Sequence, residues 1–141
     1  MGAAEETSVR RLLNLLESSD PAERKREIAE LFTEDAVYEM HVPAPAPFRG
    51  RAAIVGELSR QSGQYRDLKA EIRSLVAAGR HVITERSDSF LVPHTGDRVT
   101  NEVCAVFELD DSGLIRNWRE YWDVLALTRA MGVPVPPQQE A

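Results

Sequence analysis

The chain contains a single cysteine, Cys104, in 141 residues, which limits the ways in which it can be stabilised. One cysteine cannot form an internal disulfide, and cysteine-poor chains are typical of reducing compartments. No apolar run approaches the roughly 20 residues that a membrane-spanning helix needs. The first seven residues include Glu5 and Glu6 and lack the apolar segment of a signal peptide. We therefore expect a cytoplasmic protein that does not associate with membranes.

Basic clusters, metal-binding patterns and phosphate loops are missing as well. The formal net charge is −6, and no group of lysines and arginines forms the footprint of a nucleic-acid-binding face, so we expect no nucleic-acid partner. His41, His81 and His94 lack the spacing of zinc ligands, so we expect no metal. The chain has neither a glycine-rich phosphate loop nor a Gly-x-Ser-x-Gly turn, and we expect no cofactor.

The composition is that of an ordinary globular domain. Hydrophobic residues make up 43% of the chain and charged residues 28%, and a chain of 141 residues suits one domain. A domain of this length buries enough apolar surface to fold without disulfides or metals. We predict a single domain over residues 1–141, with an ordered core from about residue 5 to residue 133.

The first half of the chain has mainly helical periodicity. Val9, Leu12 and Leu16 recur at helical spacing, and the sequence Ser19-Asp20-Pro21 is typical of a helix start. Residues 43–47 are too rich in proline for a central strand. We predict helices over residues 5–18, from residue 21 through Ile28, Leu31 and Phe32, and over residues 51–62, and a strand over residues 35–41.

The second half of the chain has the pattern of a sheet. Glycine-containing turns at residues 78–79, 95–97 and 111–113 separate stretches of strand-like alternation. We predict strands over residues 67–76, 80–92, 98–109 and 114–124, and a short helix over residues 125–131. Helices followed by an antiparallel meander indicate an α+β fold. We expect a cone-shaped, curved antiparallel or mixed sheet wrapped around the N-terminal helices, with an internal apolar pocket.

Three charged residues fall on strand faces that are otherwise apolar. Side chains alternate between the two faces of a strand, which places Arg86 and Asp88 with Val82, Thr84, Phe90 and Val92. On the last strand, Glu120 lies on the face of Leu114, Arg116, Trp118 and Trp122. An unpaired buried charge is very unfavourable, so we expect Arg86, Asp88 and Glu120 to meet and neutralise one another.

Two carboxyl groups beside one guanidinium can also perform chemistry. Arginine stays protonated and can bridge both groups, while two neighbouring carboxylates cannot both ionise easily, so one of them retains a proton. The pair then offers an acid and a base at neutral pH. A purely structural ion cluster would have the same pattern, because structural networks perturb pKa values too.

The first strand can present either of two faces to the pocket. Tyr38 and Met40 share the more apolar face, which makes the Tyr38 hydroxyl a candidate group in the pocket. A one-residue bulge would bring in Glu39 and His41 instead. We expect the substrate-binding wall to include Phe32, Met40, His41, Phe90, Trp118 and Trp122.

The sheet is expected to have an apolar outer face as well. Ile83, Leu91, Cys104 and Val106 fall on the side opposite the pocket. An exposed apolar face of this kind is typical of a subunit interface, and we therefore expect a homodimer.

Three segments resemble a known family. Residues 82–88 resemble the Thr-Glu-Arg-x-Asp strand of the limonene-1,2-epoxide hydrolase family, and residues 117–123 resemble its Trp-Arg-Asp-Tyr-Phe-Asp strand. Residues 35–38, followed by Pro43 and Pro45, resemble its first strand and proline-rich loop. A looser similarity runs from about Ser8 to Pro134. The last strand also recurs across the wider superfamily of nuclear transport factor 2, ketosteroid isomerase and SnoaL-type polyketide cyclases, whereas the Arg-x-Asp strand is more specific to epoxide hydrolysis.

The resemblance implies a one-step mechanism without a covalent intermediate. Asp88 would be the acid that protonates the epoxide oxygen, and Glu120 would be the base that takes a proton from water. Arg86 would bridge them, and Tyr38 would help to position the water. The chain departs from the family at two positions, with Glu120 in place of an aspartate and Met40 in place of an asparagine.

The sequence therefore predicts an epoxide hydrolase that acts on a small apolar substrate. One alternative is an isomerase or cyclase of the same superfamily, in which Glu120 or His41 abstracts a proton next to a carbonyl and Asp88 or Tyr38 stabilises the oxyanion. The other is a non-catalytic ligand-binding module, because one fold can carry many functions.

Overall fold

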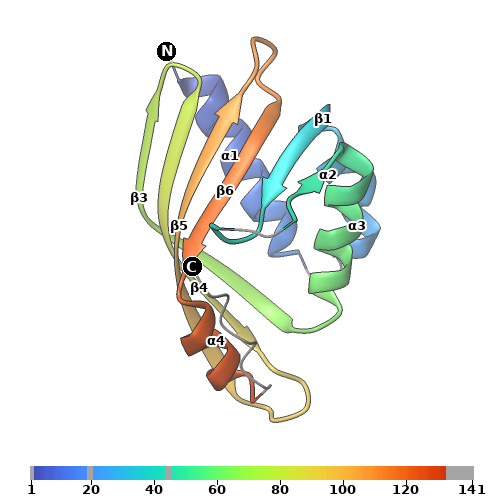
Figure 1. Cartoon of the computed structure of the whole chain (residues 1–141), viewed down its shortest axis with the longest axis vertical. Helices are drawn as coiled ribbons and strands as arrows, with labels where there is room; N and C mark the ends of the chain where they lie inside the picture. The colour runs from blue at the N-terminus through green and yellow to red at the C-terminus, as the bar shows by residue number, and fades with distance from the viewer. Residues whose placement is uncertain (1, 19–20, 44–45, 133–141) are drawn as a thin grey trace.

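A computed structural model describes residues 2–18, 21–43 and 46–132, and these residues build one curved sheet with helices on its inner side (Figure 1). The strand order is β2-β1-β6-β5-β4-β3. β1 and β6 pair in parallel, and all other neighbours are antiparallel. The strands are β1 (Phe32–Glu39), β2 (Phe48–Arg49), β3 (Arg66–Ala78), β4 (His81–Leu91), β5 (Arg98–Leu109) and β6 (Ile115–Trp122).

The helices close one side and one end of the sheet. α1 packs against β3 and β4, and α3 packs against β1. α4 follows β6 directly and contacts β5 at the lower end of the sheet in Figure 1. None of the helices in the described ranges is long and apolar enough to cross a membrane. The helical elements are α1 (Ala3–Leu16), the 3₁₀ helix η1 (Pro21–Arg24), α2 (Lys25–Ala29), α3 (Arg51–Ser62) and α4 (Val124–Ala130).

The core lies between the helices and the inner face of the sheet. α1 buries a leucine-rich stripe, including Val9 and Leu12, while Arg10 and Arg11 remain exposed. The sheet contributes large side chains that are almost wholly buried, among them Phe107 and Trp118. Burial of a side chain of this size stabilises the fold by roughly 1.5–3 kcal/mol, so this packing fixes the inner face against α1.

Irregular pairing bends the sheet. The register shifts between Phe32 and Val37 of β1, at two places in β3, and between Glu108 and Leu109 of β5. An extra residue in one strand of a pair bends that strand and increases its twist. These shifts explain why the sheet curls around the helices instead of lying flat (Figure 1).

The predicted architecture is confirmed. The α+β class, the curved mixed sheet and the N-terminal helices are all present, and α3 and β5 have the predicted bounds. Gly79, Gly96 and Gly113 adopt positive φ at the three predicted turns, a conformation that glycine reaches without strain. The predicted helix start at Ser19 and Asp20 lies outside the described residues.

Two local predictions were wrong. Leu31 and Phe32 do not continue the second helix: α2 ends at Ala29, and Phe32 begins β1 opposite Ile115 of β6. Phe32 is fully buried there, because parallel pairing and packing outweigh the helical spacing of its apolar neighbours.

The second error concerns the start of the last strand. Arg116 was placed on the inner face with Trp118, but it is exposed, and Ile115 is buried instead. Asn117 lies opposite Glu108 and Ile115 lies opposite Leu109, so Arg116 is an extra residue in β6. This bulge reverses the alternation upstream of Trp118 and also displaces Leu114 from the predicted face.

Candidate active site

A cavity of about 260 Å³ lies between the inner face of the sheet, the end of α3, and α4. Its wall is mostly apolar and includes Leu58, Phe90, Val103 and Leu127. Ligand pockets commonly have volumes of about 300–1,000 Å³. The cavity is therefore suited to a small, largely apolar molecule.

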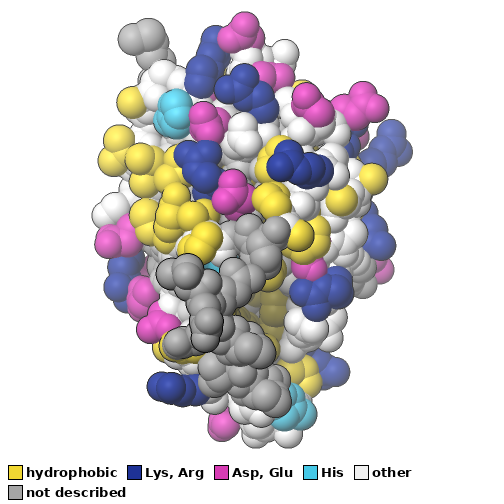
Figure 2. All heavy atoms as spheres, in the orientation of Figure 1, with side chains coloured by type: hydrophobic (Ala, Val, Ile, Leu, Met, Phe, Trp, Pro, Cys, Tyr) yellow, Lys and Arg dark blue, Asp and Glu magenta, His cyan; other side chains and the backbone are white. Residues whose placement is uncertain are grey.

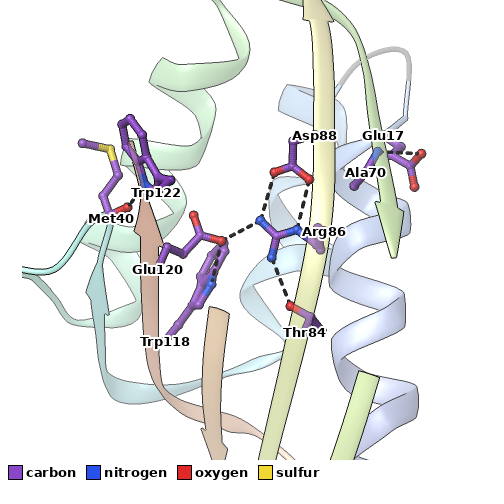
Figure 3. A network of polar contacts seen from close by, with 9 residues as sticks. All are labelled: Glu17, Met40, Ala70, Thr84, Arg86, Asp88, Trp118, Glu120 and Trp122. Carbon is purple, nitrogen blue, oxygen red and sulfur yellow. Dashed lines mark hydrogen bonds and ion pairs between the residues drawn. The ribbon is translucent and has the colours of Figure 1, made fainter. Parts of the chain in front are cut away.

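Arg86 lies between two carboxyl groups at one side of this cavity (Figure 3). Its Nε and Nη2 donate to Oδ1 and Oδ2 of Asp88 at 3.0 and 2.9 Å. Nη2 also donates to Oε2 of Glu120 at 2.7 Å. The Arg86 side chain is only 3% exposed, so its charge is compensated almost entirely by these two residues. The predicted meeting of the three residues is thus present.

Two strands, β4 and β6, bring the cluster together. Arg86 and Asp88 are two residues apart on β4, so both face inward. Glu120 comes from β6, separated from β4 by β5. Curvature of the sheet brings these inner side chains close, and Figure 3 shows Asp88 and Glu120 approaching the guanidinium from different sides.

The two carboxyl groups are held differently. Asp88 receives Arg86 with both oxygens. Glu120 uses Oε2 alone, which accepts from Arg86 and, at 3.2 Å, from Nε1 of Trp118. Oε1 of Glu120 accepts no hydrogen bond from the described residues and can therefore bind a water molecule or a substrate.

Burial and charge determine the proton affinities in the cluster. Burial raises the pKa of the Glu120 carboxyl; Arg86 opposes this shift, and the negative charge of Asp88 adds to it. Burial alone would lower the pKa of Arg86, but Glu120 and Asp88 outweigh it and raise that pKa. The guanidinium therefore stays charged, and Glu120 retains its proton to a higher pH than an ordinary glutamate.

Tyr38 reaches the cavity from β1, on the same side as Met40. Its ring stacks on Trp118 with 4.1 Å between centroids, and it is 1% exposed. Burial raises the pKa of Tyr38 well above 10, the Glu120 charge adds to this rise, and a hydrogen bond with Gln61 partly offsets it. Tyr38 therefore acts as a neutral hydroxyl and not as a base.

Gln61 of α3 joins this group and was not predicted from the sequence. Its Nε2 donates to Sδ of Met40 at 3.0 Å, and its side chain is close enough to Tyr38 to lower the pKa of that hydroxyl. A signal for it was present, because Ile54, Leu58 and Gln61 follow the buried stripe of α3 and the last of them is polar. Glu120 was identified as a polar residue on an otherwise apolar face, and the same criterion would have identified Gln61.

The structure selects one of the two predicted faces of β1. Tyr38 and Met40 line the cavity, whereas Glu39 and His41 do not. The His41 ring meets Trp122 edge-on, with 5.7 Å between centroids.

The remaining wall residues divide into two groups. Phe90, Trp118 and Trp122 line the cavity as predicted, together with Met40. Phe32 does not line the cavity, because its ring stacks on Trp118 within the core, with 6.1 Å between ring centroids. Several polar lining residues were not predicted, namely Arg60, Gln61, Gln64, Tyr65, Asn101 and Thr128.

Within the described ranges, no three His, Cys, Asp or Glu side chains are arranged to hold a metal ion.

Comparisons with known proteins identify the family and the fold. The sequence profile of the SnoaL-like domain matches residues 9–118, and the chain therefore belongs to the SnoaL-like family, whose fold is that of nuclear transport factor 2. No curated protein matches the chain in a sequence search.

Solved structures extend the comparison. The chain is 30% identical to an LEH-like epoxide hydrolase of M. tuberculosis, with a TM-score of 0.74 over 92% of this chain and 90% of that one. It is 22% identical to SalBIII, described as an epoxide hydrolase/cyclase-like enzyme of pyran ring formation in salinomycin, with a TM-score of 0.74 over 86% and 92%. A hypothetical protein of Catenulispora acidiphila, described as having a ketosteroid isomerase-like fold, is 17% identical, with a TM-score of 0.76 over 91% of this chain and 94% of that one. The fold is thus shared with proteins described as an epoxide hydrolase and as an epoxide hydrolase/cyclase-like enzyme.

The raised pKa of Glu120 predicts how stability changes with pH. Between the unfolded and the folded pKa, the folded protein holds a proton that the unfolded chain releases, so stability falls as pH rises through this window. Glutamine cannot ionise, and Glu120→Gln removes this loss. We expect the free energy of unfolding of the variant, relative to wild type, to increase from pH 4 to pH 8 in urea titrations.

Glu71→Gln is the matched control, because Glu71 is exposed on β3. The control should show no such increase. A stability difference between Glu120→Gln and wild type that is flat across this range, or a variant that loses stability relative to wild type as pH rises, would contradict the assigned direction of the pKa shift.

Proposed function

We propose that the protein is an epoxide hydrolase that adds water to a small apolar epoxide in one step. The observation that carries this proposal is the buried Arg86 bridging Asp88 and Glu120 at the wall of a small apolar cavity. One guanidinium holding two carboxyl groups provides a general acid and a general base side by side. The 30% identity to an LEH-like epoxide hydrolase supports the same class of reaction.

Glu120 is the base in this proposal. Its Oε2 is held by Arg86 and Trp118, which leaves Oε1 to accept a proton from the attacking water. A raised pKa makes the ionised carboxylate a stronger base. The Tyr38 hydroxyl and the Gln61 amide orient the water, since both line the cavity near Glu120.

Asp88 is the acid. As the water oxygen forms a bond to one epoxide carbon, the bond from that carbon to the epoxide oxygen breaks, and Asp88 transfers its proton to the oxygen. Glu120 takes one proton from the water, so the product is a neutral diol. Arg86 contacts both carboxyl groups before and after transfer, and exchange with solvent returns the proton from Glu120 to Asp88.

The two departures from the related family are compatible with this chemistry. Glu120 is one methylene longer than aspartate, but its Oε2 is fixed by two donors. Met40 replaces an asparagine amide, and the Gln61 amide donates to the Met40 sulfur and lies beside Tyr38. An amide group therefore remains beside the tyrosine, supplied by α3 instead of β1.

A second candidate is proton abstraction next to a carbonyl. The observation that favours it is the raised pKa of Glu120, because a buried carboxylate with elevated proton affinity suits the removal of a weakly acidic proton. Neighbours described as ketosteroid isomerase-like and polyketide cyclase-like have the same fold.

Isotope labelling distinguishes these activities. The purified protein is incubated with a panel of small apolar epoxides in ¹⁸O-water, and products are analysed by mass spectrometry. We expect a diol with one ¹⁸O atom, and we expect Asp88→Asn to lower kcat/KM by about 10²–10⁴-fold, the usual contribution of a general acid.

Asp35→Asn serves as the control, because Asp35 is exposed on β1 and lies outside the cavity. It should retain wild-type activity. If no epoxide yields a labelled diol but enolisable ketones exchange their α-protons in D₂O, the carbonyl reaction replaces the proposal. If neither reaction occurs and small apolar ligands still bind, the protein is a binding module.

We also propose that the protein forms a homodimer through the outer face of the sheet. Val76, Ile83 and Val106 are cross-strand neighbours on that face, and Val76 and Ile83 are 62% and 44% exposed. Cys104 and Tyr121 continue the patch on β5 and β6. Figure 2 shows hydrophobic side chains gathered over the sheet and bordered by charged ones.

Light scattering at micromolar concentration tests this assembly. We expect the mass of a dimer for wild type and the mass of a monomer for Ile83→Arg, because a charge at the centre of the patch cannot be desolvated without a partner. A wild-type monomer at this concentration would contradict the proposal.

A further inference from the structure

A bulge at the start of β3 turns Tyr65 toward the cavity. Arg66 lies opposite Leu91 and Lys69 lies opposite Ser89, so β3 has one residue more than β4 over this interval. Two consecutive residues, Arg66 and Asp67, are exposed there, and Asp67 has a φ of 53°. Regular alternation would place Tyr65 and Leu68 on opposite faces. The extra residue puts both on the inner side, and both line the cavity.

Arg98 of β5 holds this bulge in place. Its guanidinium donates to the Asp67 carbonyl at 3.3 Å, to the Asp67 carboxylate, and to the Ser89 hydroxyl at 3.0 Å. The Tyr65 ring packs on Phe90 of β4, with 5.1 Å between centroids. The direction of Tyr65 is therefore fixed from two neighbouring strands, as is common for bulges beside active sites.

The Tyr65 hydroxyl has no hydrogen-bond partner within residues 2–18, 21–43 and 46–132, although its ring is partly buried. Burial raises its pKa to about 12, and the charges of Asp88 and Glu120 contribute to the rise. The hydroxyl is thus protonated at neutral pH. It interacts electrostatically with both carboxyl groups. Tyr65 lines the same cavity as Asp88, so its hydroxyl is available to donate to a ligand there.

We propose that Tyr65 is a second hydrogen-bond donor to the substrate oxygen, acting together with Asp88. This role rests on the function proposed above and specifies how the oxygen is bound. While the C–O bond of the epoxide breaks, Asp88 transfers its proton to the oxygen and Tyr65 donates a hydrogen bond to the same atom. Tyr65 keeps its own proton throughout. Substrates therefore need an oxygen atom that can accept from two donors at once.

Tyr65→Phe tests this role, with Tyr121→Phe as the matched control. Phenylalanine keeps the ring contact with Phe90 and removes only the hydroxyl, while Tyr121 is 42% exposed on the outer face of β6. We expect Tyr65→Phe to lower kcat by about 10²-fold with little change in KM, the size of effect seen when one donor to a developing oxyanion is removed. Tyr121→Phe should match wild type in both constants.

A binding experiment separates this inference from the hydrolase activity itself. N,N-dimethylbenzamide is a neutral probe whose carbonyl oxygen can accept two hydrogen bonds, and its carbonyl infrared band shifts to lower frequency as donors are added. We expect the bound probe to absorb at a lower frequency in wild type and Tyr121→Phe than in Tyr65→Phe.

The two results can fail independently. A band shift that depends on Tyr65 in a protein without epoxide turnover would overturn the hydrolase function and retain Tyr65 as an oxygen-binding group. Equal kcat values in wild type and Tyr65→Phe would overturn the inference. Identical carbonyl bands in the two proteins, or the absence of saturable probe binding to wild type, would also overturn it.

Discussion

The arrangement of the site depends on one guanidinium shared by two carboxyl groups. Arg86 is almost fully buried and donates to Asp88 and Glu120 at 2.7–3.0 Å. A buried charge of this kind persists only when its partners are fixed in place. The inward curvature of the sheet and the packing of Trp118 against Tyr38 serve that requirement, because they bring β4 and β6 side chains to the same point. The same burial raises the pKa of Glu120, and Arg86 only partly offsets this rise.

The parts of the fold that depend on local pattern could be predicted from the sequence. α3 begins after a glycine and ends at a glycine, and β5 lies between two glycine turns, so their bounds were evident. The charged cluster was also evident, because Arg86, Asp88 and Glu120 each interrupt an apolar strand face and cannot remain unpaired. Alternation on β1 favoured Tyr38 and Met40 over Glu39 and His41, and the structure agrees.

The parts of the fold that depend on strand pairing could not be predicted from the sequence. Phe32 fits the helical spacing of Ile28, and only its pairing with β6 makes it a strand residue. The bulges at Arg116 and at Asp67 cannot be detected from the spacing of apolar residues, because they are defined by the pairing with the partner strand. Ile115 and Tyr65 were therefore assigned to no site or face. Gln61 is different, since its position at the end of the α3 stripe could have been noticed.

Coupling between the two carboxyl groups is the central claim, and it can be measured directly. The δ-carbon of Glu120 is followed by ¹³C NMR against pH in protein labelled at glutamate, with Glu120→Gln used to assign the signal. The account predicts a Glu120 midpoint above the usual range of glutamate in wild type, and a lower midpoint in Asp88→Asn, since burial and the Asp88 charge both raise the pKa. A Glu120 midpoint in the usual range that is unchanged in Asp88→Asn would contradict the account, because the two carboxyl groups bound to Arg86 would then titrate independently.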